Sequence, residues 1–468
     1  MRRTIVTVPT TPASPRPGAG PARRSAARRL VPRPSPLDAE ILRLAVPAFG
    51  ALVAEPLFVL ADTAVVGHLG TPQLAGVAVA GAALTTLVAL CVFLAYATTA
   101  AVARRVGAGD LAGALRQGVD GLWLAAGLGA GLAVLAAATA GPVVRALGAE
   151  SAAAGHARTY LLASAPGIPA MLLVLAATGV LRGLQDTRTP LVVAASGAAV
   201  NAPLNLLLVH GAGLGVAGSA LGTVLVQAAM AATFLRIVVR GARRAGTPLG
   251  PSWAGARAAA SAGAPLLVRT LTLRAAILLT TWVAARQGDT AVAAHQVAFA
   301  LWGLLALALD AVAIAGQALV GRHLGAGDVA TARAATRRMV GWGAVSGAVL
   351  GALVVALRPA YDGWFSPDPA VQALLAGVLL VAAVQQPVAG VVFALDGVLI
   401  GAGDGRYLAA AGVVTLVVYA PLALLVAATS AGLSALWWAF GGFMLARLVT
   451  LVLRWRSDAW LVTGATRA

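Results

Sequence analysis

Lysine is absent from this sequence, and all 34 of its basic residues are arginine. A P-loop needs a lysine to bind nucleotide phosphates, and Schiff-base catalysis needs a lysine amine. The absence therefore excludes both chemistries and argues against an intrinsic ATPase motor. Cysteine occurs once, as Cys91 inside an apolar run, so it can form no intramolecular disulfide and is expected to pack in the interior.

Charged residues are also scarce. They make up only 11% of the 468 residues, whereas 60% are hydrophobic and the mean hydropathy is +0.88. Soluble domains carry about 25% charged residues. Apolar runs of membrane-spanning length recur along most of the chain, without the short alternating segments of a membrane β-barrel. The sequence therefore predicts an all-α polytopic membrane protein. Nucleic-acid binding is not expected despite the net charge of +18, because the arginines lie beside apolar spans.

The two halves of the chain repeat each other at a fixed offset of 218 positions. Paired halves in a hydrophobic chain are the architecture of many secondary transporters, with the substrate site at their interface. In each repeated Gly-Ala-Gly-Asp turn, glycine suits the end of one helix and aspartate can cap the next. The repeated elements are Arg104-x-x-Gly-Ala-Gly-Asp110 with Arg322-x-x-Gly-Ala-Gly-Asp328, Leu181-x-Gly-x-x-Asp-x-Arg188 with Leu399-x-Gly-x-x-Asp-x-Arg406, and Pro47 and Gly70 with Pro265 and Gly288.

Twelve membrane spans are predicted, six in each half. They cover residues 41–69, 74–103, 119–140, 160–181, 190–210 and 214–239, and then 262–286, 292–320, 339–357, 372–400, 408–428 and 433–453. An even number of spans per half means that both halves enter the membrane in the same direction, so their pseudo-twofold axis should lie along the membrane normal. The predicted domains are a disordered basic tail (1–37), a first six-helix lobe (38–244), a linker (245–257), a second six-helix lobe (258–456) and a C-terminal tail (457–468).

Arginines gather after the even-numbered spans, as in Arg240, Arg243 and Arg244 after the sixth and Arg333 and Arg337 after the eighth. The loops after the odd-numbered spans hold few. By the positive-inside rule, the even loops and both termini, including the two tails, are expected to be cytoplasmic. We expect a multi-pass protein of the plasma membrane.

Asp62 is the strongest functional candidate inside the spans, where a carboxylate at the centre costs about 2.5–3.5 kcal/mol. Its repeat partner is Thr280, so the symmetry of the fold does not require this acid. It follows Pro47 and Pro56, and either proline can kink a helix. We interpret Asp62 as a cation-coupling residue whose protonation is linked to helix shape. The alternative is an aspartate permanently bonded to a neighbouring helix.

Glu55, Asn201 and Asn205 are candidates to line one polar substrate cavity with Asp62. Glu55 lies seven residues before Asp62, nearly two turns, and so shares its helix face. Asn201 and Asn205 are four residues apart on the fifth span, at about the depth of Asp62. A snorkelling or hydrogen-bonded Glu55, and asparagines that only join helices, agree equally well with the sequence.

The second half offers a different set of polar residues. Arg274 and Asp310 lie at equal depth on adjacent spans, which predicts a structural ion pair, with Asp310 as a second titrating site as the alternative. Gln296 and Gln317 either line the substrate cavity or cross-link helices. Asp396 lies close to the predicted cytoplasmic end of its span, where water access reduces its cost. The sequence shows no nucleophile–base constellation and no metal-ligand spacing, so we expect neither an enzyme nor a metal site.

The first span, from Pro47 through Glu55-Pro56 and Asp62 to Gly70, resembles the first helix of MATE (multidrug and toxic compound extrusion) transporters, especially their DinF-like branch. The resemblance covers about residues 38–456. It is supported by Ala294-His-Gln-Val297, Asp310-Ala-Val-Ala-Ile-Ala-Gly-Gln-Ala-Leu-Val-Gly321, Leu181-Arg-Gly-x-Gln-Asp186 and Val216-Ala-Gly-Ser-Ala-Leu-Gly222.

The resemblance implies a twelve-helix, two-lobed antiporter that exports small organic compounds, often cationic, against a proton or sodium gradient. It makes Asp62 the coupling acid, Pro47 the point at which the helix bends, and Asn201 a polar family position. Some relatives carry aspartate where this chain has Asn205, and the missing charge favours protons over sodium. We expect a monomer in contact with membrane lipids and without a cofactor. A flippase for a lipid-linked precursor and a non-transporting membrane sensor remain alternatives.

Overall fold

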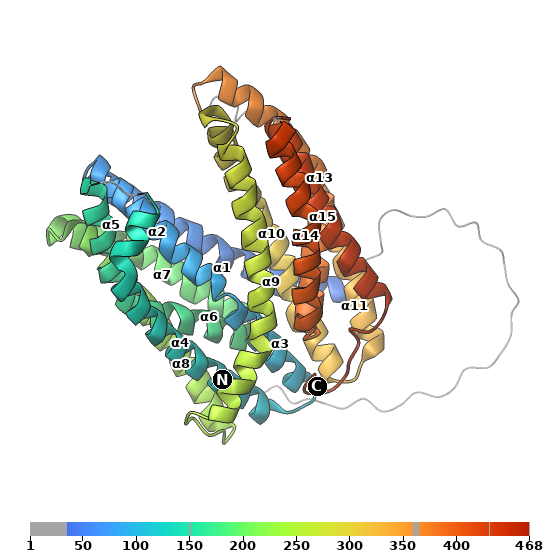
Figure 1. Cartoon of the computed structure of the whole chain (residues 1–468). Coiled ribbons are helices and arrows are strands. Elements are labelled where there is room, and N and C mark those ends of the chain that lie inside the picture. The colour runs from blue at the N-terminus through green and yellow to red at the C-terminus, as the bar shows by residue number, and fades with distance from the viewer. Residues whose placement is uncertain (1–34, 149–150, 359–364, 430, 468) are drawn as a thin grey trace, which may run out of the picture. The chain divides into compact units, whose positions relative to one another are not determined.

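The computed structural model describes residues 35–148, 151–358, 365–429 and 431–467, and the regular elements in these ranges are all helices (Figure 1). Twelve helical spans are long and apolar enough to cross a membrane. The predicted all-α fold with twelve spans is therefore confirmed. The predicted basic tail, residues 1–37, lies almost wholly outside the described residues.

In the first half, several spans consist of more than one helix. The second span is broken at Cys91 and Val92, the fourth at a 3-10 turn (Ala165–Gly167), and the fifth ends in a π-helical turn (Leu207–Gly211). The helices are α1 (Pro36–Gly67), α2 (Thr71–Leu90), α3 (Phe93–Gly107), α4 (Leu111–Ala146), α5 (Ser151–Ser164), α6 (Ile168–Gly183), α7 (Arg188–Leu206) and α8 (Gly215–Arg244).

The second half begins where the side chain of Ser252 caps α9 by accepting a hydrogen bond from the backbone N–H of Gly255 at 3.1 Å. Residues 253–257, the end of the predicted linker, therefore belong to this helix. The helices are α9 (Trp253–Ala285), α10 (Asp289–Gly325), α11 (Val329–Ala356), α13 (Pro369–Gly401), α14 (Gly405–Thr429) and α15 (Leu433–Arg456).

The repeated Gly-Ala-Gly-Asp turns have the structural role that the sequence predicts. Gly109 and Gly327 take positive φ angles of 78° and 76°, which glycine adopts without strain. Asp110 then caps α4 by accepting from the backbone N–H of Gly113 at 2.8 Å, and Asp328 caps α11 by accepting from Thr331 at 2.9 Å. The same sharp turn thus follows α3 in the first half and α10 in the second.

The sequence repeat is also a repeat of helix contacts. A Cβ atom on Gly179 of α6 would collide with the backbone of Ala95 on α3, and one on Gly397 of α13 would collide with the backbone of Ala313 on α10. Gly397 lies 218 positions after Gly179, and Ala313 lies 218 positions after Ala95. Small residues let membrane helices cross at close range, so the same close crossing is built once in each half.

The two halves pack together where α3 and α10 end, and these helices contact each other (Figure 1). Arg104 of α3 donates a hydrogen bond to the carbonyl oxygen of Ala402, which follows α13, at 3.2 Å. Arg322 of α10 donates to Oε1 of Gln185, which follows α6, at 2.7 Å. Each repeat arginine therefore binds the turn of the other half, and two motifs that are distant in sequence meet there.

The segment after α15 returns to this junction. Trp460 is fully buried, and the backbone N–H of Gly464 donates to the carbonyl of Leu324 at 3.0 Å. Arg104 donates to the carbonyl of Val462 at 2.8 Å, and Arg467 donates to that of Ala402 at 3.2 Å. The predicted C-terminal tail thus binds residues of both halves.

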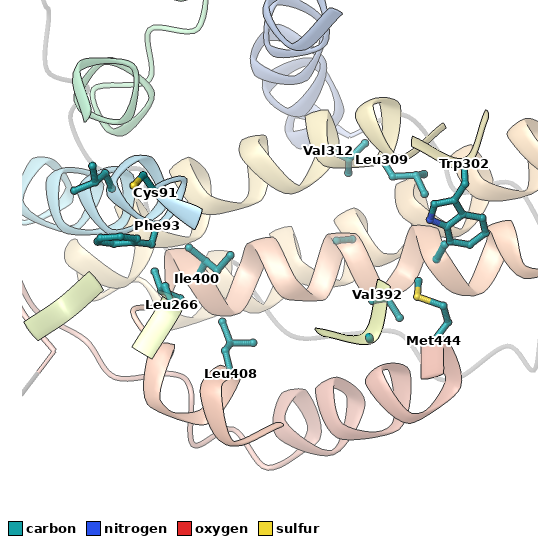
Figure 2. Packing of buried hydrophobic residues seen from close by; sticks show 14 of the residues in the cluster. Cys91, Phe93, Leu266, Trp302, Leu309, Val312, Val392, Ile400, Leu408 and Met444 are labelled. Carbon is teal, nitrogen blue, oxygen red and sulfur yellow. The ribbon is translucent and has the colours of Figure 1, made fainter. Parts of the chain in front are cut away.

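A buried apolar cluster extends across both halves of the chain. Figure 2 shows Phe93 of α3 in this cluster together with Leu266 of α9 and Ile400 of α13. Gly263 of α9 lies against the Phe93 ring, where a Cβ atom would come within 2.6 Å. Cys91 is 5% exposed and forms no disulfide, which confirms its predicted packing role.

Candidate functional site

Asp62 lies five residues before the end of α1 and is only 8% exposed. Its neighbours Val59 and Leu60 are 56% and 64% exposed, so the aspartate is on the inward face of the helix. Pro47 and Pro56 both lie inside α1, which is one uninterrupted α-helix in this structure. Each proline lacks a backbone N–H donor, so the helix is easier to bend at two points on the N-terminal side of Asp62.

Three neutral side chains from three other helices bind the Asp62 carboxylate. Thr223 of α8 donates its hydroxyl to Oδ2 at 3.1 Å, and the Tyr160 hydroxyl of α5 lies 3.5 Å from the same atom. The Asn205 amide of α7 donates to Oδ1. The acid therefore links α1 to three other helices through hydrogen bonds, and it forms no ion pair with an arginine among the described residues.

Asn201 and Asn205 extend this network along α7, and both are fully buried. Nδ2 of Asn205 also donates to Oδ1 of Asn201 at 3.2 Å, and Nδ2 of Asn201 donates to the Thr223 hydroxyl at 3.2 Å. Oδ1 of Asn205 is buried without a hydrogen-bond partner. We call Asp62, Tyr160, Asn201, Asn205 and Thr223 the Asp62 cluster.

The other cavity candidates lie outside this cluster. Glu55 is exposed and makes no hydrogen bond or ion pair with the described residues, although it shares a helix with Asp62. Gln296 is exposed on α10, whereas Gln317 is 1% exposed and its Oε1 has no partner. The structure thus brings together Asp62, Asn201 and Asn205 but not Glu55 or the two glutamines.

Tyr160 and Thr223 are the members of the cluster that the sequence analysis did not identify. Both carry neutral hydroxyls, which are inexpensive to bury when hydrogen-bonded and therefore do not stand out in an apolar span. They come from helices far apart in the sequence, and the signal that could have found them is weak: each is a hydrogen-bonding side chain in the predicted outer half of its span.

The equivalent positions of the second half lack an acid. Adding the repeat offset to Asp62 and Asn201 gives Thr280 and Tyr419, whose hydroxyls hydrogen-bond at 2.5 Å. Asn205 and Thr223 correspond to an alanine and a glycine, Ala423 and Gly441. The cluster is therefore an asymmetric addition to a symmetric scaffold, and the symmetry of the fold does not require it.

The predicted ion pair between Arg274 and Asp310 is wrong. Arg274 forms no ion pair with the described residues, and the arginines whose charges act on Asp310 are Arg182 and Arg269. Arg269 lies five residues before Arg274, on another face of α9, and this face packs inward: Arg269 is 9% exposed. Equal depth alone could not show which arginine faces α10.

Asp396 is more deeply embedded than the sequence analysis suggested. It is 6% exposed and is paired with two arginines instead of lying at a wet helix end. Arg269 donates from Nε to Oδ1 at 3.0 Å and from Nη2 to Oδ2, and Nη2 of Arg447 lies 3.4 Å from Oδ2. The second half therefore contains an arginine-rich centre, in contrast to the lone acid of the first half.

Comparison with known proteins places this architecture in one family. The MatE family model matches residues 47–207 and 265–425, two stretches that are themselves 218 positions apart. The chain is 32% identical over 430 residues to the Protein DETOXIFICATION 44, chloroplastic, of Arabidopsis thaliana, covering 88% of this chain and 80% of the relative. It is 32% identical over 296 residues to the DNA damage-inducible protein F of Escherichia coli, covering 62% and 64%.

A further relative is a "Probable multidrug resistance protein NorM" of Pseudomonas syringae, 28% identical over 447 residues, with 92% of this chain and 97% of the relative covered. Among solved structures, a MATE protein in the bent conformation matches with a TM-score of 0.84 at 23% identity, covering 92% of this chain and 98% of the other. The repeat, the twelve spans and the family match over both halves agree, and the chain belongs to the MATE family of membrane transporters.

Proposed function

We propose that this protein is a secondary active antiporter that exports small organic compounds, often cationic, in exchange for protons. Family membership supports the transport of organic substrates. The export of toxic compounds is supported by the Pseudomonas syringae relative, which is named as a probable multidrug resistance protein.

The observation that carries the proposal is the burial of Asp62 among neutral partners. Thr223, Tyr160 and Asn205 donate to it, and no arginine among the described residues pairs with it. An ionised carboxylate without a counter-charge is very costly in low-dielectric surroundings, so the group holds a proton or a bound cation instead. Asp62 is thus suited to exchange one cation for another.

Loss or gain of a proton at Asp62 changes the hydrogen bonds that join α1 to α5, α7 and α8. Pro47 and Pro56 allow α1 to bend in response. In this cycle a proton enters at Asp62, α1 bends, and the substrate leaves the cleft between the lobes. The proton and the substrate drive the exchange only if each has a different affinity for the inward and outward states.

Asn205 supports protons as the coupling ion. It takes the position at which some members of the family carry a second acid, and it binds Asp62 directly. A neutral amide beside one carboxylate leaves a single negative charge in the cluster, which one proton neutralises. A site with two adjacent carboxylates would need a second cation to hold both charges.

We place the protein in the plasma membrane with both termini on the cytoplasmic side. The arginine bias of the even-numbered loops supports this orientation. In this orientation, the junction of Arg104 and Arg322 lies on the cytoplasmic side and the Asp62 cluster lies in the outer half of the membrane. The Arabidopsis relative is named as chloroplastic, and that location is a description of the relative, not of this chain.

The decisive experiment measures drug-dependent proton flux in proteoliposomes with Asp62→Asn. This substitution keeps the size and hydrogen-bonding ability of the side chain but cannot bind and release a proton. Glu55→Gln on the same helix is the matched control, because it removes an exposed acid outside the cluster. We expect coupled flux to be lost in Asp62→Asn and retained in Glu55→Gln.

Undiminished coupled flux in Asp62→Asn would remove Asp62 from the mechanism. Separate pH and sodium gradients identify the coupling ion, because a proton antiporter responds to the first alone. Flux of a lipid-linked precursor without any ion dependence would favour a flippase. Drug binding without net transport by the wild type would favour a sensor.

A further inference from the structure

A partly open cavity lies between α9, α13, α14 and α15 of the second half, far in sequence from the Asp62 cluster. Its polar lining consists of Arg269, Asp396, Arg447, Thr415 and Thr450, and we call it the arginine pocket. The rest of the lining is apolar. Neither guanidinium is exposed at the surface, since the Arg269 and Arg447 side chains are 11% and 12% exposed.

The arginines in this pocket have more donors than acceptors. A guanidinium carries five N–H donors. Arg269 donates to Asp396 from two of its nitrogens. One nitrogen of Arg447 lies 3.4 Å from Oδ2 of Asp396, and another lies 3.9 Å from the sulfur of Met444. The pocket therefore presents unused donors around a carboxylate that already occupies part of the space.

The charges around the pocket do not balance. Arg269 and Arg447 face one acid, Asp396. The next charged groups are Asp310, whose charge acts on Arg269, and Arg182, whose charge acts on Asp310. Three arginines against two aspartates leave an excess of one positive charge inside membrane-spanning helices, where an unbalanced charge is costly.

We propose that the arginine pocket binds an oxyanion, the phosphate or carboxylate group of a small anion or of a lipid headgroup. The ligand would take the donors that Arg269 and Arg447 leave free and would neutralise the excess charge. Paired guanidinium groups suit oxyanions because their planar N–H donors match two oxygens at once. Asp396 competes for the same donors, so it limits the affinity of the site.

Phosphate-dependent stability of the purified full chain tests the proposal independently of transport. The thermal midpoint is measured in a neutral detergent while inorganic phosphate replaces a bulky sulfonate buffer at constant ionic strength. A ligand that binds the folded state raises the midpoint once its concentration exceeds the dissociation constant, and the rise then grows with the logarithm of the concentration. We expect the wild type to respond and Arg447→Gln to lose the response.

Asp396→Asn separates an anion site from a purely structural ion pair. Removing the competing carboxylate should lower the phosphate concentration at which the midpoint begins to rise by about tenfold or more. An ion pair without a ligand role predicts the opposite, a variant that is less stable and no more responsive to phosphate. Arg447→Lys keeps the charge but has fewer donors, so phosphate should raise its thermal midpoint only weakly. This variant tests the proposal if Arg447→Gln fails to fold.

Arg454→Gln is the matched control, since Arg454 is also on α15 but pairs with Asp404 outside the pocket, at 2.6 Å. It should respond to phosphate like the wild type. A second arm uses nanodiscs with and without phosphatidylglycerol. If a lipid headgroup is the ligand, this lipid raises the wild-type midpoint but not that of Arg447→Gln, and free phosphate adds nothing. The proposal is overturned if neither phosphate nor phosphatidylglycerol changes the wild-type thermal midpoint, or if phosphate acts equally on the wild type and on Asp396→Asn.

Discussion

Gly107 and Gly325 occupy equivalent places in the two halves, and each lies against the backbone of the other's helix. A Cβ atom on Gly107 would collide with the carbonyl of Arg322, and one on Gly325 would collide with the carbonyl of Arg104. All four positions are related by the repeat offset. The contact is therefore reciprocal, as expected for two residues on either side of a pseudo-twofold axis.

This contact predicts that alanine is not tolerated at Gly325. The added methyl group would meet backbone atoms, which cannot rotate away, so α3 and α10 would have to separate. We expect Gly325→Ala to lower the free energy of unfolding by about 1–3 kcal/mol. Gly303→Ala on the same helix is the control, because a Cβ atom there has nothing within 4 Å. Equal thermal midpoints for the two variants would contradict the reciprocal contact.

The two repeat arginines should differ in their contribution to stability. Arg104 is 2% exposed and donates to the carbonyls of Ala402, Val462 and Thr466, whereas the Arg322 side chain is 45% exposed. Buried hydrogen bonds from a charged group contribute more than exposed ones. We expect Arg104→Gln to cost about 2–3 kcal/mol and Arg322→Gln less than about 1 kcal/mol in thermal unfolding. A larger loss for Arg322→Gln would show that the C-terminal segment does not stabilise the junction.

The fold was predictable because it depends on signals that repeat along the chain. Length and hydropathy define the spans, and the offset of 218 defines the two halves, whatever the details of packing. The exact ends of the helices were less predictable from the sequence. Ser252 starts α9 at Trp253, inside the segment expected to be a linker, since a capping serine outweighs the nearby glycines and prolines.

The candidate site was predictable only in part. Asp62, Asn201 and Asn205 stand out because an acid and two amides are rare and costly in apolar spans. The pairing of Asp396 with Arg269 depends on how α9 is rotated about its axis, and this is decided by contacts between distant helices. A choice between Arg269 and Arg274 therefore needed the structure.

Acid should remove the stability that the capping aspartates provide. The pKa of Asp110, in the turn before α4, lies below its ordinary value of 3.8, mainly because the Gly113 N–H donates to the carboxylate, with a further contribution from Arg105. A lowered folded-state pKa gives stability that is present above the unfolded-state pKa and is lost as the pH falls through the folded-state pKa. Asp110→Asn should therefore be less stable than the wild type at pH 6, and the difference should shrink as the pH falls below 3.8 and through the lowered folded-state pKa of Asp110.

Thermal midpoints of both proteins across this pH range test the expectation. Asp328 has the same role before α11, where the hydroxyl and N–H of Thr331 lower its pKa, so Asp328→Asn should behave in the same way. A stability difference that persists unchanged into acid would mean that the charge of these caps does not matter.

Replacing Asn205 by aspartate should change the coupling ion. The new carboxylate would contact Asp62, because the amide it replaces donates to that residue. Two adjacent carboxylates cannot both stay ionised unless a cation lies between them, so the cluster would either share a proton or bind sodium. We expect drug transport by Asn205→Asp in proteoliposomes to be stimulated by a sodium gradient. Asn205→Ala, which adds no charge, should stay insensitive to sodium. Transport by Asn205→Asp that responds to pH alone would show that the charge at this position does not select the ion.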